Sequence, residues 1–178
     1  MGLKPVGSYR ILPSDPHWPR MFAEEQLRIA EALHLAAERI EHIGSTAVAG
    51  LGAKPIIDVM AGIDIPPTSA RGEPLLDRLR ATGYVIGGTE TAPGTRYGRK
   101  AEPHRYNLHL TQYRNEFWTS RLAFRDYLRT HPVVAAEYEK MKRDILTRMG
   151  SEISQPAYND AKAEFVQSVT RRALAEPR

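Results

Sequence analysis

Three features between residues 42 and 64 could together hold phosphate groups and a metal ion. Residues 44–46 form a Gly-Ser-Thr turn, Lys54 follows it, and Asp58 lies in an apolar run. A turn that exposes backbone N–H groups and a hydroxyl suits phosphate oxygens. A carboxylate on a nearby strand suits Mg²⁺ held against the same phosphates. We therefore expect phosphate to contact Gly44, Ser45, Thr46 and Lys54, and a metal ion to bind Asp58.

The apolar run from Ile56 to Ile65 predicts a central strand that is buried on both faces. In nucleotidyltransferases a Gly-Ser turn precedes a strand with two acids separated by one residue, so that both point to one face. Such a pair can bind two Mg²⁺ ions and align a hydroxyl with an α-phosphate. Here Met60 stands where the second acid would be, and Asp64 is too far along to share an ion with Asp58. The alternative is a plain turn followed by a hydrogen-bonded acid.

We expect two histidines to lie close to these features. The alternating residues 105–111 predict a strand with Asn107 and His109 on one face. We interpret His109 as a metal ligand or general base that completes the site of Asp58. A buried histidine that donates to a carbonyl is the alternative. His42 directly precedes the turn, and we expect it to hold the turn through a hydrogen bond.

Basic residues form a second group. Arg121, Arg125 and Arg129 step by four along a predicted helix and would form a ribbon on one side of it. Arginine forks bind phosphate through two hydrogen bonds. A solvated helix face is the alternative for charges at this spacing. We therefore predict that phosphate binds to the turn, residues 44–46, and to six further residues: Lys54, Arg105, Arg125, Arg129, Tyr158 and Lys162.

The elements expected to position these residues divide into an α/β part, about 10–112, and a helical part, about 115–174. An irregular, proline-rich arm covers residues 1–20. We expect residues 94–100, which are basic and rich in glycine, to form a mobile or ligand-facing loop after another loop at 87–92. The predicted helices are 22–36, 73–82, 115–130, 133–149 and 156–174, and the predicted strands are 39–43, 55–65, 83–86 and 105–111.

The composition excludes several classes of protein. The 178 residues contain no cysteine, which excludes disulfides and thiolate metal sites and fits a reducing cytoplasm. No apolar run approaches the length of a membrane span, so we expect a cytoplasmic protein with no membrane partner. The net charge of +4 favours anionic ligands, but it is too small to predict a nucleic-acid partner.

Several long segments resemble the GrpB family. They are residues 42–48, 50–51, 53–58, 107–110 and 122–129, followed by His131-Pro132, by Tyr138 and Lys142, and by Tyr158, Lys162 and Phe165. The resemblance covers roughly residues 10–173. It implies a nucleotidyltransferase-like α/β fold with a mixed sheet flanked by helices and a C-terminal three-helix part. A related domain is fused to dephospho-coenzyme A kinase in some bacteria.

The resemblance and the predicted site favour an enzyme that binds an NTP with Mg²⁺, or Mn²⁺ in its place. It would transfer a nucleotidyl group to a small-molecule acceptor, with Asp58 and His109 as catalytic and metal-binding residues. Three alternatives remain. One is a non-catalytic module that binds a phosphorylated ligand or assists a coenzyme A enzyme. The second is adenylate-forming, ligase-type chemistry, and the third and weakest is an RNA-directed transferase.

Overall fold

One mixed sheet forms the centre of the molecule. The computed structural model describes residues 9–87 and 92–176, and within them five strands follow the order β1-β2-β5-β4-β3. β2 and β5 are parallel, and the other neighbouring strands are antiparallel. The strands are β1 (Ile40–Ile43), β2 (Ile57–Ile63), β3 (Val85–Ile86), β4 (Arg96–Lys100) and β5 (Tyr106–Gln112). The expected α/β class with a mixed sheet is therefore confirmed.

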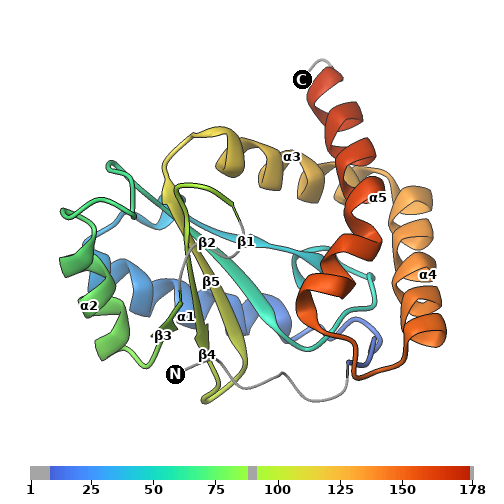
Figure 1. Ribbon diagram of the computed structural model, residues 1–178, viewed down its shortest axis with the longest axis horizontal. Coiled ribbons are helices and arrows are strands. Elements are labelled where there is room, and N and C mark those ends of the chain that lie inside the picture. The colour runs from blue at the N-terminus through green and yellow to red at the C-terminus, as the bar shows by residue number, and fades with distance from the viewer. Residues whose placement is uncertain (1–8, 88–91, 177–178) are drawn as a thin grey trace.

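Helices cover both faces of this sheet (Figure 1). α1 (Trp18–Leu33) and α2 (Glu73–Ala81) pack together on one face, and α3 (Glu116–Thr130) lies on the other. α4 (Pro132–Met149) and α5 (Gln155–Ala175) stack beside α3 and complete the C-terminal three-helix part. Among the described residues, no helix combines the length and the apolar content that a membrane span requires.

The pairing of β2 with β5 decides which side chains face the C-terminal helices. Asp58 and Met60 point to that face, and the strand register places Asn107 beside Asp58 and His109 beside Met60. The opposite face packs on α1 and α2 as an apolar core. Its strand residues include Ile40, Ile57, Val59, Ala61, Ile63, Tyr106, Leu108 and Leu110. The face that carries Asp58 is therefore the polar one, where a site can form.

The starts of the last three helices follow from residues with a known capping effect. Asn115 accepts a hydrogen bond from the backbone N–H of Trp118 at 2.9 Å, and Ser154 accepts one from Ala157 at 3.3 Å. Pro132 occupies the first turn of α4, where its missing N–H has no intrahelical acceptor to lose. The predicted ranges of these three helices agree with the structure to within one residue at each end.

Two expectations for the α/β part were wrong. The first helix begins at Trp18 rather than at Phe22. Residues 94–100 are not a mobile loop, because 96–100 form β4 between β5 and β3. Gly98 of this strand pairs with Ile86 of β3, and a Cβ at Gly98 would come within 2.7 Å of the Ile86 side chain. Most of the predicted loop at 87–92, and residues 1–8 of the predicted arm, lie outside the described residues.

Candidate functional site

The Gly-Ser turn lies directly against Asp58. Gly44 follows β1 with a φ of +73°, a conformation that glycine adopts without strain. An added Cβ at Gly44 would be 2.4 Å from Oδ2 of Asp58. The turn thus requires glycine both for its backbone conformation and for its contact with the carboxylate.

Replacing Gly44 by alanine tests this contact. We expect a loss of stability of about 2 kcal/mol or more, because strain at positive φ adds to the clash with Asp58. Gly50→Ala is a matched control, since Gly50 has a φ of +78° and a Cβ there would meet nothing within 4 Å. Denaturant unfolding of both variants should show the larger loss for Gly44→Ala. Equal losses would mean that contact with Asp58 adds nothing to the backbone strain.

A chain of hydrogen bonds fixes the orientation of the Asp58 carboxylate. Its Oδ1 accepts a hydrogen bond from the Asn107 amide at 2.7 Å, and Oδ1 of Asn107 accepts one from the Tyr97 hydroxyl, also at 2.7 Å. The Tyr97 oxygen in turn accepts from Arg99 Nε at 3.3 Å. Arg99 also donates to Gln155, the first residue of α5. The helical part therefore reaches the carboxylate through side chains of β4 and β5.

Lys142 of α4 joins the turn from the other side. Its ammonium donates to Ser45 Oγ at 3.0 Å and to the carbonyl of Gly52 at 2.6 Å. Lys142 is only 2% exposed, and this burial, together with the nearby charge of Lys162, lowers its pKa to about 7. A lysine held in this way can change its protonation state near neutral pH.

Lys54 is a cation without an anionic partner in contact. Its Nζ lies 3.9 Å from the ring centre of Tyr9 and 4.4 Å from that of Tyr158. Within the described part of the chain, this ammonium makes no hydrogen bond or ion pair. Burial and the charge of Lys162 lower the Lys54 pKa to about 8, although Asp58 opposes that shift. The two aromatic faces compensate only part of the lost hydration, so the amine is suited to receive an anion.

Six basic side chains, three of which interact with Asp58 itself, form what we call the cationic cluster. They interact electrostatically with one another, with Asp58 or with the tyrosines beside it. They come from the loop before β2, from β4, from the residue before β5, and from all three C-terminal helices: Lys54, Arg99, Arg105, Arg121, Lys142 and Lys162. Together with Asp58 and the Gly44–Ser45 turn, the cluster makes up the Asp58 site. Its charge strongly favours a ligand with several negative charges.

Burial raises the pKa of the Asp58 carboxyl, although the Asn107 hydrogen bond and the charge of Lys54 counteract this shift. The two positions that could hold a second acid carry other residues: Asn107 lies opposite Asp58 in the register, and the fully buried Met60 follows it by two residues on β2. In the described ranges, no three side chains of the types His, Cys, Asp and Glu converge as metal ligands. Asp58, Asn107 and Met60 do not provide the ligands of a two-ion site. Asp58 fits one Mg²⁺ or Mn²⁺ that also uses phosphate oxygens and water as ligands.

His109 lies two residues further along β5 than Asn107, beside Met60. Its ring packs 5.2 Å from that of Tyr97 and 5.9 Å from that of Phe117. Burial lowers its pKa to about 3, so the ring is neutral, and its buried Nδ1 has no hydrogen-bond partner among the described residues. The structure thus places His109 on the same face of the sheet as Asp58. The residue that contacts the Asp58 carboxylate, however, is Asn107 and not His109.

Thr46 has a structural part in the turn. Its hydroxyl bonds to the His42 ring at 2.9 Å and lies 3.4 Å from the carbonyl oxygen of Ile56, and the side chain is buried. This agrees with the expectation that His42 holds the turn through a hydrogen bond. Only the backbone of Thr46 is therefore left for a phosphate contact.

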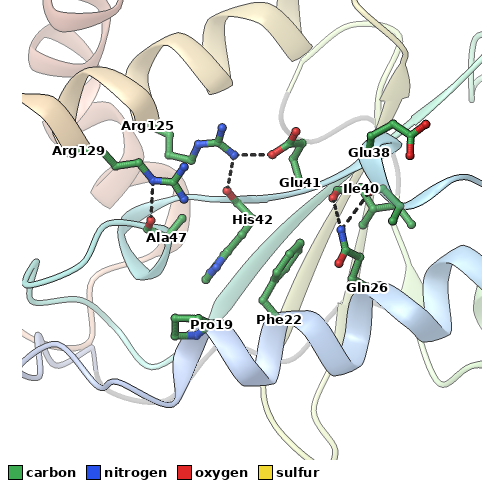
Figure 2. A pocket seen from close by; sticks show the side chains of 11 residues that line it. Pro19, Phe22, Gln26, Glu38, Ile40, Glu41, His42, Ala47, Arg125 and Arg129 are labelled. Atoms are coloured by element: carbon green, nitrogen blue, oxygen red, sulfur yellow. Dashed lines mark hydrogen bonds and ion pairs between the residues drawn. The ribbon is translucent and has the colours of Figure 1, made fainter.

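Arg125 and Arg129 lie beside the end of β1 and the turn that follows it (Figure 2), and neither is among the charged groups that shift the Asp58 pKa. Arg125 pairs with Glu41 at 2.6 Å and also donates to the carbonyl of His42 at 3.0 Å. Arg129 donates to the carbonyl of Ala47 at 3.0 Å. They line a cavity of about 380 Å³, and Arg129 also lines a second one of about 650 Å³. Because acids and carbonyls already engage these arginines, they attract an anion less than the cationic cluster does.

The interpretation of the sequence did not place Lys142, Arg121, Arg99, Asn107 or Tyr9 in the site. One signal for Lys142 was present, because Tyr138 and Lys142 have the same spacing as Tyr158 and Lys162. In each pair the lysine lies over its own tyrosine, at 4.8 Å in α4 and 5.1 Å in α5. The repeated spacing thus marks the two helices that supply lysines to the same site.

The fold and the site define a mixed α/β protein with one central carboxylate and a cationic cluster. The model of the GrpB protein family matches residues 8–172, and the chain belongs to this family. A UPF0157 protein of Pseudomonas aeruginosa is 36% identical, over 94% of this chain and 69% of its own. The glutamate-rich protein GrpB of Alkalihalophilus pseudofirmus is 28% identical, over 92% of this chain and 94% of its own.

Two further comparisons concern the fold and the domain context. The crystal structure of the conserved protein GrpB from Enterococcus faecalis matches with a TM-score of 0.79 and 30% identity, over 93% of this chain and 97% of that one. A dephospho-CoA kinase of Mycolicibacterium paratuberculosis is 28% identical over 92% of this chain. The match spans only 46% of that kinase, so it concerns one part of a longer protein.

Proposed function

We propose that this protein binds a nucleoside triphosphate at the Asp58 site and transfers its nucleotidyl group to a small-molecule acceptor. The observation that carries the proposal is the ammonium of Lys54, which lies over Tyr9 and Tyr158 in the cationic cluster and has no hydrogen-bond or ion-pair partner among the described residues. A triphosphate supplies the negative charge that this cluster lacks. Backbone N–H groups of the turn and the Ser45 hydroxyl suit its oxygens.

Each group of the site has a part in this proposal. Lys54 and Lys162 neutralise the phosphates, Lys142 holds the Ser45 hydroxyl, and Arg105 and Arg121 belong to the same cluster. A magnesium ion that arrives with the nucleotide would supply further charge neutralisation, with Asp58 as its carboxylate ligand. Asn107 keeps that carboxylate turned toward the Gly44 backbone.

A non-catalytic module that grips a phosphorylated ligand is the second candidate. The amide of Asn107 and the buried Met60 favour it, because neither supplies the second acid of a two-ion transferase. This candidate predicts binding that persists in EDTA and no product, whereas the transferase yields pyrophosphate. Since the relatives include dephospho-CoA kinases, dephospho-coenzyme A belongs among the ligands to be screened.

Thermal-shift and calorimetric titrations with ATP, GTP, CTP and UTP, each with Mg²⁺ and with EDTA, test the binding step. A triphosphate at about 100 times its Kd should stabilise the protein by about 2.7 kcal/mol. If no triphosphate or dephospho-coenzyme A binds at millimolar concentration, the proposed function fails.

Replacing Lys54 by methionine is expected to weaken triphosphate binding at least about tenfold. A hydrogen bond to a charged group is worth about 1.5–3 kcal/mol, and about 1.4 kcal/mol corresponds to a factor of ten. Lys140→Met is the matched control, because Lys140 is an exposed residue of α4 that pairs with Asp144. Calorimetry should show unchanged affinity for the control. An unchanged affinity for Lys54→Met would remove Lys54 from the site.

A further inference from the structure

Ser45 and Lys142 form a pair of side chains with the geometry of a nucleophile and its base. Lys142 Nζ lies 3.0 Å from Ser45 Oγ. Ser45 is partly exposed, whereas Lys142 is almost completely buried behind it. A base held within hydrogen-bond reach of a hydroxyl is the arrangement that activates a serine nucleophile, and lysine can take this role.

The surroundings of Lys142 favour its neutral form. Lys54, Lys162 and Arg143 disfavour its positive charge, while Glu139 favours that charge, and burial has the largest effect. The Gly52 carbonyl accepts from the same Nζ at 2.6 Å and thereby fixes the position of the amine. A neutral amine in this position can accept the proton of Ser45 Oγ.

Next to this pair, the structure offers a place for the developing negative charge. The backbone N–H groups of Ser45 and Thr46 donate to no protein acceptor within the described residues. They precede the first hydrogen bond of the short 3₁₀ turn Ser45–Ala47, in which the N–H of Ala47 donates to Gly44. Free N–H groups beside a nucleophile can stabilise an oxyanion.

We propose that Ser45 is the nucleophile of a two-step transfer and that Lys142 is its general base; this inference rests on the proposed function. Ser45 Oγ attacks the α-phosphorus of the bound triphosphate. The Oγ–P bond forms, the bond from the α-phosphorus to the bridging oxygen breaks, and pyrophosphate leaves. The serine proton passes to Lys142 Nζ.

In the second step an acceptor hydroxyl attacks the same phosphorus. The Oγ–P bond breaks, Lys142 returns its proton to Ser45 Oγ, and the acceptor proton passes to solvent. In this reaction Lys142 activates the nucleophile, which a second metal ion would do in a two-ion transferase. The site therefore does not need the acid that Met60 and Asn107 fail to supply.

Exchange of labelled pyrophosphate into the triphosphate, measured without an acceptor, tests this sequence of steps. The full-length protein is incubated with each NTP and Mg²⁺, and its intact mass is recorded in parallel. We expect exchange, and a mass increase of one nucleotidyl group per chain. Ser45→Ala should abolish both results, whereas Ser151→Ala, at an exposed serine between α4 and α5, should change neither.

Lys142→Arg separates the base from the hydrogen-bond donor, because arginine still donates hydrogen bonds but does not accept a proton at these pH values. This variant should still show a thermal shift with the triphosphate and should lose at least about 99% of the exchange. A thermal shift without exchange or adduct in the wild-type protein would overturn the covalent step and leave the proposed function standing. Exchange that persists in Ser45→Ala would also overturn it, and absence of any thermal shift would overturn both proposals.

Discussion

Raising the pH from 7 to 9 is expected to stabilise the unliganded protein by about 3 kcal/mol. The reason is the pair of lysines with lowered pKa values, about 7 for Lys142 and about 8 for Lys54. In the unfolded chain both amines titrate near 10.4. Between these values the unfolded state binds more protons than the folded state, so the free energy of unfolding rises with pH. Well below pH 7 both lysines are charged in the folded protein, and the burial of the two charges then lowers the free energy of unfolding most strongly.

Denaturant unfolding of the wild-type protein and of the double variant Lys54→Met/Lys142→Met checks this effect. The variant should be more stable than the wild type at pH 7, and the difference should shrink toward pH 9, because methionine has no charge to bury. Lys140→Met should follow the wild-type curve. A wild-type protein whose stability does not change from pH 7 to 9 would show that water reaches both amines.

The lysines of the site also show how much of it can be predicted from the sequence. Residue types and spacing identified the turn, Lys54, Asp58 and the Tyr158–Lys162 pair, and the structure brings them together. Strand alternation and the spacing of four on a helix are local rules, so the sequence shows which side chains of one element share a face. The regular elements were found for the same reason, apart from β4.

The errors and omissions concern contacts between elements that are distant in the sequence. Arg121, Arg125 and Arg129 belong to one helix at regular spacing, but only Arg121 interacts with Asp58. Arg125 instead meets Glu41, an acid of β1 whose position depends on the docking of α3 against that strand. In the same way, Asn107 rather than His109 contacts Asp58 because the register of β2 and β5 decides the pairing. Periodicity within one element cannot provide such a register.

The register of β2 and β5, which places Asn107 beside Asp58, leads to a second prediction with a large effect on stability. Asn107→Asp would place a carboxylate where an amide now donates to Asp58 at 2.7 Å. We expect a loss of stability of roughly 3 kcal/mol above pH 6, because two like charges would share a partly buried position. The loss should shrink at lower pH, where one carboxyl holds a proton. Asn159→Asp, at an exposed position of α5, is the matched control and should change the stability little.

The same variant should gain a site for a free divalent ion. Oδ1 of Asn107 already accepts a hydrogen bond from the Tyr97 hydroxyl, so an aspartate can keep this orientation and turn its second oxygen toward Asp58. Two carboxylates at this distance suit Mn²⁺ or Mg²⁺. Millimolar Mn²⁺ should therefore restore much of the lost stability in Asn107→Asp, with no comparable shift in the wild type or in Asn159→Asp. If Mn²⁺ stabilises the wild type equally, Asp58 holds a free ion without a second acid. If it stabilises neither protein, the cationic cluster repels the ion, and a bound polyanion is needed before any metal can enter.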